Sequence, residues 1–123
     1  METKTIFSAA TSLLAATAAL GMVLAGFRFL TDRRSPTWLA RVHGLAAVAS
    51  ILMLTYGWSL GGFSRAASFG LVTLVAAAVG GVMLSRGFRL KDKPLPELLV
   101  FLHMSAAFVG ALVIGLVLVS FSA

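Results

Sequence analysis

Four long apolar stretches, separated by three short breaks, occupy almost the whole chain. They cover residues 5–30, 37–60, 65–87 and 95–121. Each is long enough to cross a bilayer as a helix, which takes about 20 residues, and in lipid a helix bonds its backbone polar groups within its own segment. Hydrophobic residues make up 59% of the chain and charged residues 11%, which argues against a water-soluble globule. We therefore predict an all-α membrane protein whose single transmembrane domain spans residues 1–123.

The basic residues gather around the first and third breaks, and the formal net charge is +6. This distribution follows the positive-inside rule of membrane proteins and does not indicate a nucleic-acid partner. We expect a multi-pass protein of a bacterial inner membrane, with the first and third breaks in the cytoplasm and both termini outside, in the periplasm. The first stretch is read as a helix and not as a cleaved signal peptide, because it continues without charge to Phe27. The basic residues concerned are Arg28, Arg33, Arg34 and Arg41 at the first break and Arg86, Arg89, Lys91 and Lys93 at the third.

An internal repeat of 60 residues relates the two halves of the chain, about 5–60 and 65–120. When the sequence is shifted by 60 without gaps, glycine, aspartate, proline and histidine all match in one register. Such matches are far less common than matches of alanine or leucine in a chain of this composition. The predicted fold is therefore a four-transmembrane-helix up-down bundle built from a tandem repeat of a two-helix hairpin, with the second and fourth helices on one diagonal. The matched pairs are Gly21 and Gly81, Asp32 and Asp92, Pro36 and Pro96, and His43 and His103.

His43 and His103 are the candidate functional residues of the two halves. Each follows a proline, Pro36 or Pro96, by seven residues, which is roughly 10 Å along a helix. Both imidazoles should therefore lie at one level, in the cytoplasmic half of the membrane, and face each other across the diagonal. Ionisable side chains inside membrane spans are functional candidates by default.

Small residues surround the expected level of the histidines. Ala47 and Ala107 lie one turn further along the same helices, and Gly21, Gly80 and Gly81 fall at a similar depth on the first and third helices. Small residues in membrane helices often serve close helix packing. Beside two paired histidines, they predict an open volume between the helices.

A single haem b with His43 and His103 as its two axial ligands accounts for this pattern. Imidazole is a usual haem ligand, and two imidazoles complete the coordination of the iron. Diagonal helices at equal depth would present them to opposite faces of one flat ring, with the glycines facing the ring edges. The propionates would point to the cytoplasmic face, where arginine pairs well with carboxylates. The arginines in reach of that face are Arg28, Arg41, Arg86 and Arg89.

With these residues the chain resembles small membrane b-type cytochromes, namely the cytochrome b561-like proteins and the haem-binding membrane anchors of respiratory oxidoreductases. The resemblance is architectural and covers the whole chain: four helices, with facing histidines in His43-Gly-Leu-Ala-Ala and His103-Met-Ser-Ala-Ala. It implies an electron-transfer protein rather than a stand-alone catalyst, with a quinone or a membrane redox complex as partner besides the lipid bilayer. A homodimer is compatible with this type. Two histidines in total allow one bis-histidine haem.

Two other interpretations stay open. The histidines could be hydrogen-bonding residues between helices, in a structural or assembly subunit of a membrane complex or in a small transporter. They could also bind copper or zinc, since copper accepts histidine and methionine, although Met104 is the only methionine adjacent to a histidine. The absence of cysteine excludes thiolate metal sites and disulfides.

Overall fold

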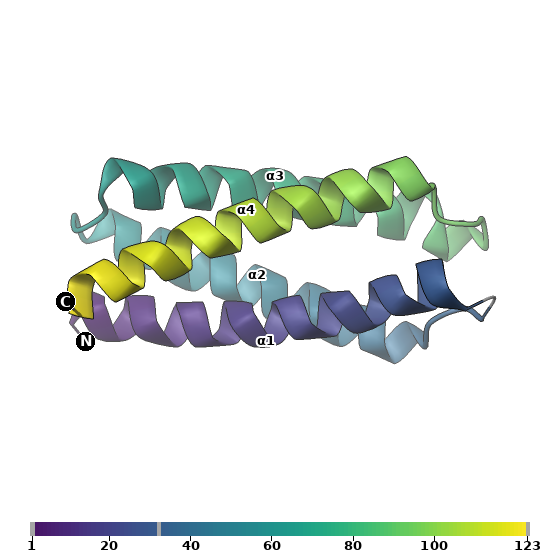
Figure 1. Cartoon of the computed structure of the whole chain (residues 1–123), viewed down its shortest axis with the longest axis horizontal. Helices are drawn as coiled ribbons and strands as arrows, with labels where there is room; N and C mark the ends of the chain where they lie inside the picture. The colour runs from purple at the N-terminus through teal and green to yellow at the C-terminus, as the bar shows by residue number, and fades with distance from the viewer. Residues whose placement is uncertain (1, 32, 123) are drawn as a thin grey trace.

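Four helices and one short 3-10 turn make up the computed structural model of the chain, which describes residues 2–31 and 33–122 (Figure 1). All four helices are long and apolar enough to cross a membrane, and the described residues contain no strand. The all-helical prediction is confirmed, and the helix ends agree with the apolar stretches within two residues. The elements are α1 (Thr3–Leu30), α2 (Thr37–Ser59), α3 (Arg65–Gly87), η1 (Arg89–Lys91) and α4 (Glu97–Ser122).

Proline fixes the starts of α2 and α4. Pro36 directly precedes α2, and Pro96 directly precedes α4. Proline suits a helix start because the N–H that it lacks has no partner there in any case. The Pro36 carbonyl accepts the Ala40 N–H at 3.4 Å, and the Pro96 carbonyl accepts the Val100 N–H at 3.0 Å. The two helices therefore begin at positions 60 residues apart.

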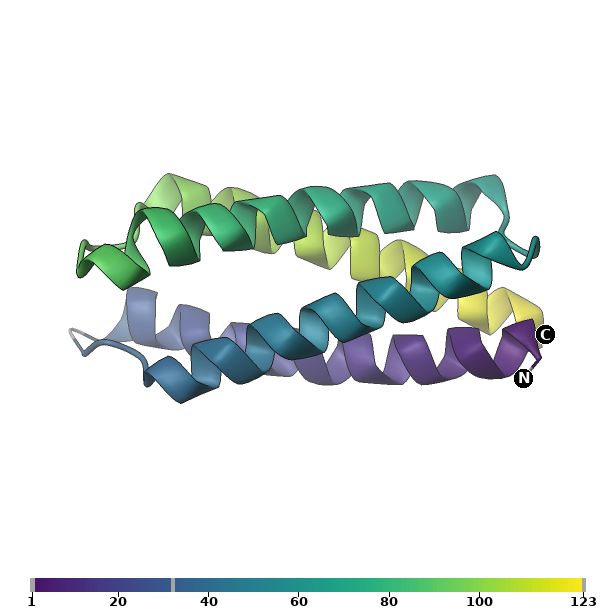
Figure 2. The ribbon, with the colours of Figure 1, turned by 180° about the vertical axis from the view of Figure 1, so that it is seen from behind.

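The helices pack as two hairpins, α1 with α2 and α3 with α4, and the hairpins meet through α1 with α4 and α2 with α3. In the described residues, the backbones of α1 and α3 do not pack together, nor do those of α2 and α4. The second and fourth helices are therefore diagonal, as predicted. The hairpins converge at the end where α1 begins and α4 ends, and they diverge toward the end that holds residues 33–36 and 88–96 (Figures 1 and 2). We call these the core end and the loop end. Asp32, which the repeat pairs with Asp92, lies outside the described residues.

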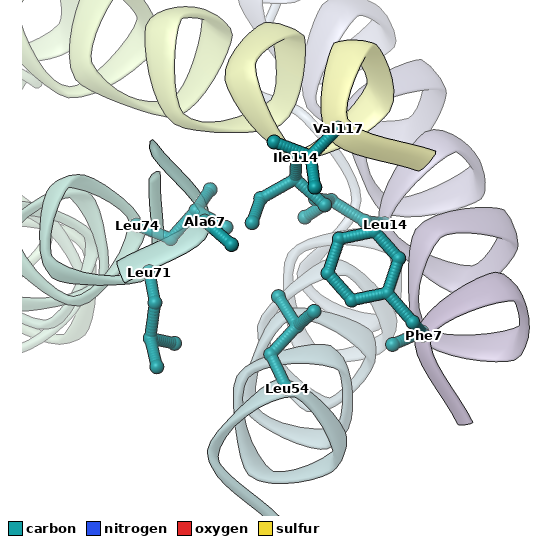
Figure 3. Close-up of a cluster of buried hydrophobic side chains, with 9 residues drawn as sticks. Phe7, Leu14, Leu54, Ala67, Leu71, Leu74, Ile114 and Val117 are labelled. Atoms are coloured by element: carbon teal, nitrogen blue, oxygen red, sulfur yellow. The ribbon is translucent and has the colours of Figure 1, made fainter. Parts of the chain in front are cut away.

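The main hydrophobic core lies at the core end, where side chains from all four helices meet (Figure 3). Phe7 is almost fully buried, and its ring meets the rings of Phe63 and Phe121 edge to face, with centroids 5.2 and 5.7 Å apart. This packing joins the hairpins at one end and leaves the level of the histidines outside the core. The core cluster consists of Phe7, Ala10, Leu14, Leu54, Ala67, Leu71, Leu74, Ile114 and Val117.

Two glycines allow α3 and α4 to approach closely near the core. A Cβ on Gly110 would lie 2.7 Å from Leu74 Cγ and 3.1 Å from the Gly70 carbonyl oxygen. A Cβ on Gly70 would lie 3.0 Å from Ile114 and 3.3 Å from the Gly110 carbonyl oxygen. The second hairpin therefore depends on glycine at this crossing.

Candidate functional site

The imidazoles of His43 and His103 meet across the α2–α4 diagonal. Because the helices begin at Thr37 and Glu97, each histidine is the seventh residue of its helix. The ring centroids lie 6.2 Å apart, and the ring planes are inclined at 84°. Both side chains are partly buried. The structure thus brings the two residues together as their matched spacing predicts.

Each imidazole is oriented by a backbone carbonyl of the other helix in its own hairpin. His43 Nδ1–H donates to the Thr17 carbonyl at 2.9 Å, and His103 Nδ1–H donates to the Ala77 carbonyl at 2.7 Å. A carbonyl can only accept, so Nδ1 carries the proton in the neutral ring and Nε2 keeps its lone pair. Metal-binding histidines characteristically donate their other N–H in this way, which fixes the tautomer and the ring direction.

Gly21 and Gly81 make room for these two hydrogen bonds. A helical carbonyl at residue 17 also accepts the N–H of residue 21, so the residue at 21 stands directly beside the acceptor that His43 approaches. A Cβ on Gly21 would lie 2.9 Å from His43 Cε1, and a Cβ on Gly81 would lie 3.1 Å from His103 Cε1. Both distances are closer than ordinary van der Waals contact, so an alanine would push the imidazole aside.

The three glycines lie beside the imidazoles of the two histidines. Gly21 and Gly81 each face the histidine of their own hairpin, and Gly80 lies beside it, 3.6 Å from His103 Cβ when a Cβ is added. None of the three is among the described residues that line the pocket between the hairpins. The absence of a side chain at these positions therefore leaves space for the imidazoles themselves.

A pocket lies between the hairpins at the level of the histidines. It encloses about 60 Å³, and about 460 Å³ when the space at its open sides is included. Ala47 and Ala107 line it, as expected. Every lining residue has a counterpart in the lining set 60 residues away: Leu14 and Leu74, Thr17 and Ala77, Ala18 and Ala78, His43 and His103, Ala47 and Ala107, and Ile51 and Ala111.

The candidate propionate-binding arginines lie at the loop end, outside the pocket lining. Arg28 donates to the Leu95 carbonyl at 2.9 Å, and Arg89 donates to the Ser35 hydroxyl at 2.7 Å. Arg41 and Arg86 are exposed. Two of the four arginines, Arg28 and Arg89, thus make contacts between the hairpins that the sequence does not predict.

The chemistry available at the site is that of two neutral nitrogen donors. A metal–imidazole bond is about 2 Å long, so two nitrogens on opposite sides of one ion lie about 4 Å apart and the ring centres, each roughly 1 Å further back, about 6 Å apart. The observed 6.2 Å matches that spacing. Among the described residues, no three or more His, Cys, Asp or Glu side chains are grouped so that they could hold a metal ion. The site itself presents two imidazole ligands.

Comparison with protein families, with curated proteins and with solved structures finds no match to this chain.

Proposed function

We propose that the protein is a membrane b-type cytochrome that binds one haem b through His43 and His103 and transfers single electrons. One observation carries the proposal: two imidazoles, each with Nδ1 on a backbone carbonyl, face each other with centroids 6.2 Å apart. His43 and His103 would hold the haem through their imidazoles, and a haem with both of its remaining ligand positions filled in this way would supply electron transfer as its chemistry.

The lining of the pocket supports a flat macrocycle between the hairpins. The enclosed volume of about 60 Å³ is far below the roughly 300–1,000 Å³ of pockets that hold drug-sized ligands, so a macrocycle would extend into the open sides between the hairpins. A flat ring would have its centre between the imidazoles and its edges in the open sides. The alanines at positions 47, 77, 78 and 107 keep large side chains away from its faces.

We further propose that the bundle is a tandem repeat of one hairpin in a bacterial inner membrane, with its loop end in the cytoplasm. The hydrogen bonds of the histidines, the glycines beside them and the lining pairs all recur at an offset of 60 residues. The basic residues of the loop end supply the charge bias that orients such a bundle. We infer a quinone or a membrane redox complex as the partner from the resemblance to small membrane b-type cytochromes.

The alternative of purely structural histidines accounts for only part of the site. The bonds from Nδ1 to the Thr17 and Ala77 carbonyls do join helices, as that alternative requires. They do not explain why the two rings meet across the diagonal, or what role the Nε2 atoms have, since neither takes part in these hydrogen bonds. A single copper ion between the two nitrogens would explain this, and the experiment below separates it from haem.

The experiment that tests the proposal is the visible spectrum of the full-length protein purified from haem-replete cells. We expect a Soret band and, on reduction, sharp α and β bands of low-spin haem. A colourless protein that contains one equivalent of copper would mean that the histidines bind a single copper ion and not haem. A colourless, metal-free protein would support the structural alternative.

A further inference from the structure

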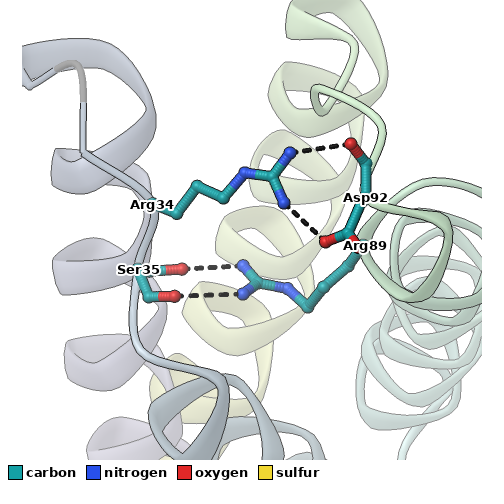
Figure 4. Close-up of polar contacts among 4 residues, drawn as sticks. All are labelled: Arg34, Ser35, Arg89 and Asp92. Carbon is teal, nitrogen blue, oxygen red and sulfur yellow. Dashed lines mark hydrogen bonds and ion pairs between the residues drawn. The ribbon is translucent and has the colours of Figure 1, made fainter.

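Polar contacts tie the two hairpins together at the loop end (Figure 4). Arg34 donates from Nη1 to the Asp92 carboxylate at 2.6 Å and from Nη2 to the Asp92 carbonyl at 2.7 Å. Arg89 donates to the Ser35 hydroxyl at 2.7 Å and to the Ser35 carbonyl at 3.4 Å. Each guanidinium holds two acceptors on the opposite hairpin. We call these four residues the loop clamp.

The loop clamp depends on the local conformation of the third break. The 3-10 turn η1 places Arg89 toward the first break, and Asp92 then adopts a left-handed conformation with φ 55°. Aspartate is among the few residues other than glycine that tolerate this region. The turn presents both the carboxylate and the carbonyl of Asp92 to one arginine (Figure 4).

The loop clamp is not a product of the 60-residue repeat. The counterpart of Arg34 is Pro94, and the counterpart of Arg89 is Phe29. Proline and phenylalanine have no guanidinium group that could donate these hydrogen bonds, so the repeat does not produce a second clamp. The histidines, the glycines and the residues that line the pocket, by contrast, occur in pairs. A feature present once requires a reason other than the duplication.

The position of the clamp relative to the histidines supplies that reason. The core joins the hairpins at one end. At the other end they are joined by the clamp and by Arg28, which donates to the Leu95 carbonyl at 2.9 Å and pairs with Glu97 at 3.2 Å. Between these two attachments the pocket is lined mainly by alanines, with Leu14, Ile51 and Leu74 on the side of the core, and alanines offer little packing to fix a separation. Since each histidine lies seven residues into its helix, roughly 10 Å from the loop end, the distance between the imidazoles follows from both attachments.

We propose that Arg34, Ser35, Arg89 and Asp92 are positioning residues that hold the hairpins at the separation at which both imidazoles bind one iron. This inference rests on the proposed function. An exposed ion pair alone contributes little, and Arg34 and Asp92 are exposed. The clamp therefore acts through both arginines together, each with a double contact, and its test requires both to be changed.

The variant Arg34→Gln/Arg89→Gln removes both guanidinium groups. Its control is Arg33→Gln/Lys91→Gln, which makes the same change in charge in the same two loops. Both control residues are exposed and lie outside the clamp. A second test variant, Ser35→Ala/Asp92→Gly, removes the side-chain acceptors and leaves both arginines in place; glycine at 92 keeps the left-handed conformation accessible.

Spin-label distances measure the separation of the hairpins without relying on haem. The chain has no cysteine, so labels can be attached at Val42 and Leu102, exposed counterparts that directly precede the histidines. Leu52 and Leu112, also exposed counterparts, report on the core end. We expect both test variants to widen the distance distribution between 42 and 102 in lipid nanodiscs, and to leave that between 52 and 112 unchanged.

The spin state of the haem gives the second measurement. In the test variants we expect a share of high-spin ferric haem, binding of carbon monoxide after reduction, and haem loss to a scavenger protein several-fold faster than in the control variant. If the wild-type protein holds low-spin haem and the test variants match the control in distances and spin state, the clamp has no positioning role and the proposed function stands. If the wild-type protein holds no haem, the proposed function and the positioning role are both overturned.

Discussion

At the scale of single residues, the site consists of one unit used twice: a histidine, a carbonyl acceptor 26 positions before it, and a glycine 22 positions before it. The acceptor directs Nδ1, and the glycine leaves space for the ring. His43 and His103 could be identified from the sequence, because their spacing from a proline is the same in both halves. The sequence also indicated the glycines as site residues. Their contact with the imidazoles depends on how α1 is rotated relative to α2, and the spacing of residues within one helix does not reveal that rotation.

Removal of either imidazole tests the symmetry of the site. We expect His43→Ala and His103→Ala each to abolish the low-spin haem spectrum to a similar degree, since each supplies one of two axial bonds. The measurement is the reduced spectrum of each purified variant, with Val42→Ala, an exposed neighbour, as control. A normal low-spin spectrum in either histidine variant would remove that histidine from the ligand set.

The glycine beside each imidazole gives a second prediction. In Gly21→Ala the new Cβ would lie 2.9 Å from His43 Cε1, so the ring must shift or lose its bond to Thr17. Overpacking of this kind costs about 1–3 kcal/mol, and we expect weaker haem retention.

Gly26→Ala is the matched control in the same helix, because no atom lies within 4 Å of its added Cβ. It should stabilise the protein by about 0.5–1 kcal/mol, as glycine in mid-helix is unfavourable. The rate of haem transfer to a scavenger protein measures haem retention in both variants. Equal retention in the two would mean that Gly21 does not support the imidazole.

At the scale of elements, the bundle consists of two close hairpins attached to each other at both ends. The lengths of the apolar stretches and the positions of the prolines predicted the ends of all four helices to within two residues. The short turn η1 and the loop clamp were not predicted, because they depend on how the first and third breaks meet across the molecule. Contacts between distant loops leave no periodic pattern in the sequence.

The crossing of α3 and α4 offers a prediction at this scale. Gly110→Ala would place a Cβ 2.7 Å from Leu74 Cγ and 3.1 Å from a backbone oxygen of α3. Because the backbone cannot move aside without separating the helices, we expect a loss of about 1–3 kcal/mol and a lower melting temperature by circular dichroism in detergent. Gly115→Ala, in the same helix and with no atom within 4 Å of its added Cβ, should not lower it. A melting temperature for Gly110→Ala at or above that of Gly115→Ala would contradict the close crossing.

At the scale of the whole molecule, the core and the histidines occupy different levels along the bundle, and the pocket reaches from one to the other through Leu14 and Leu74. The core lies near the termini, and the histidines lie toward the loops. The diagonal relation of α2 and α4 followed from the order of four helices joined by short loops, and it brought the histidines to one site. The divergence of the hairpins toward the loop end could not be predicted, because it depends on how side chains from all four helices pack at the core end.

Orientation in the membrane gives the prediction at this scale. The basic residues of the loop end favour the cytoplasm. A reporter active only in the periplasm should give signal when fused to the C-terminus and none when inserted at Asp92. The reverse pattern would place the histidines in the periplasmic half of the membrane.

Low-temperature electron paramagnetic resonance of the oxidised protein shows directly whether His43 and His103 together bind one haem iron. Two imidazole ligands make ferric haem low-spin, and ring planes inclined at 84° should make its signal strongly anisotropic. We predict a low-spin ferric signal that integrates to one iron for each chain. A high-spin ferric signal in the wild-type protein, or no haem-iron signal, would contradict the account.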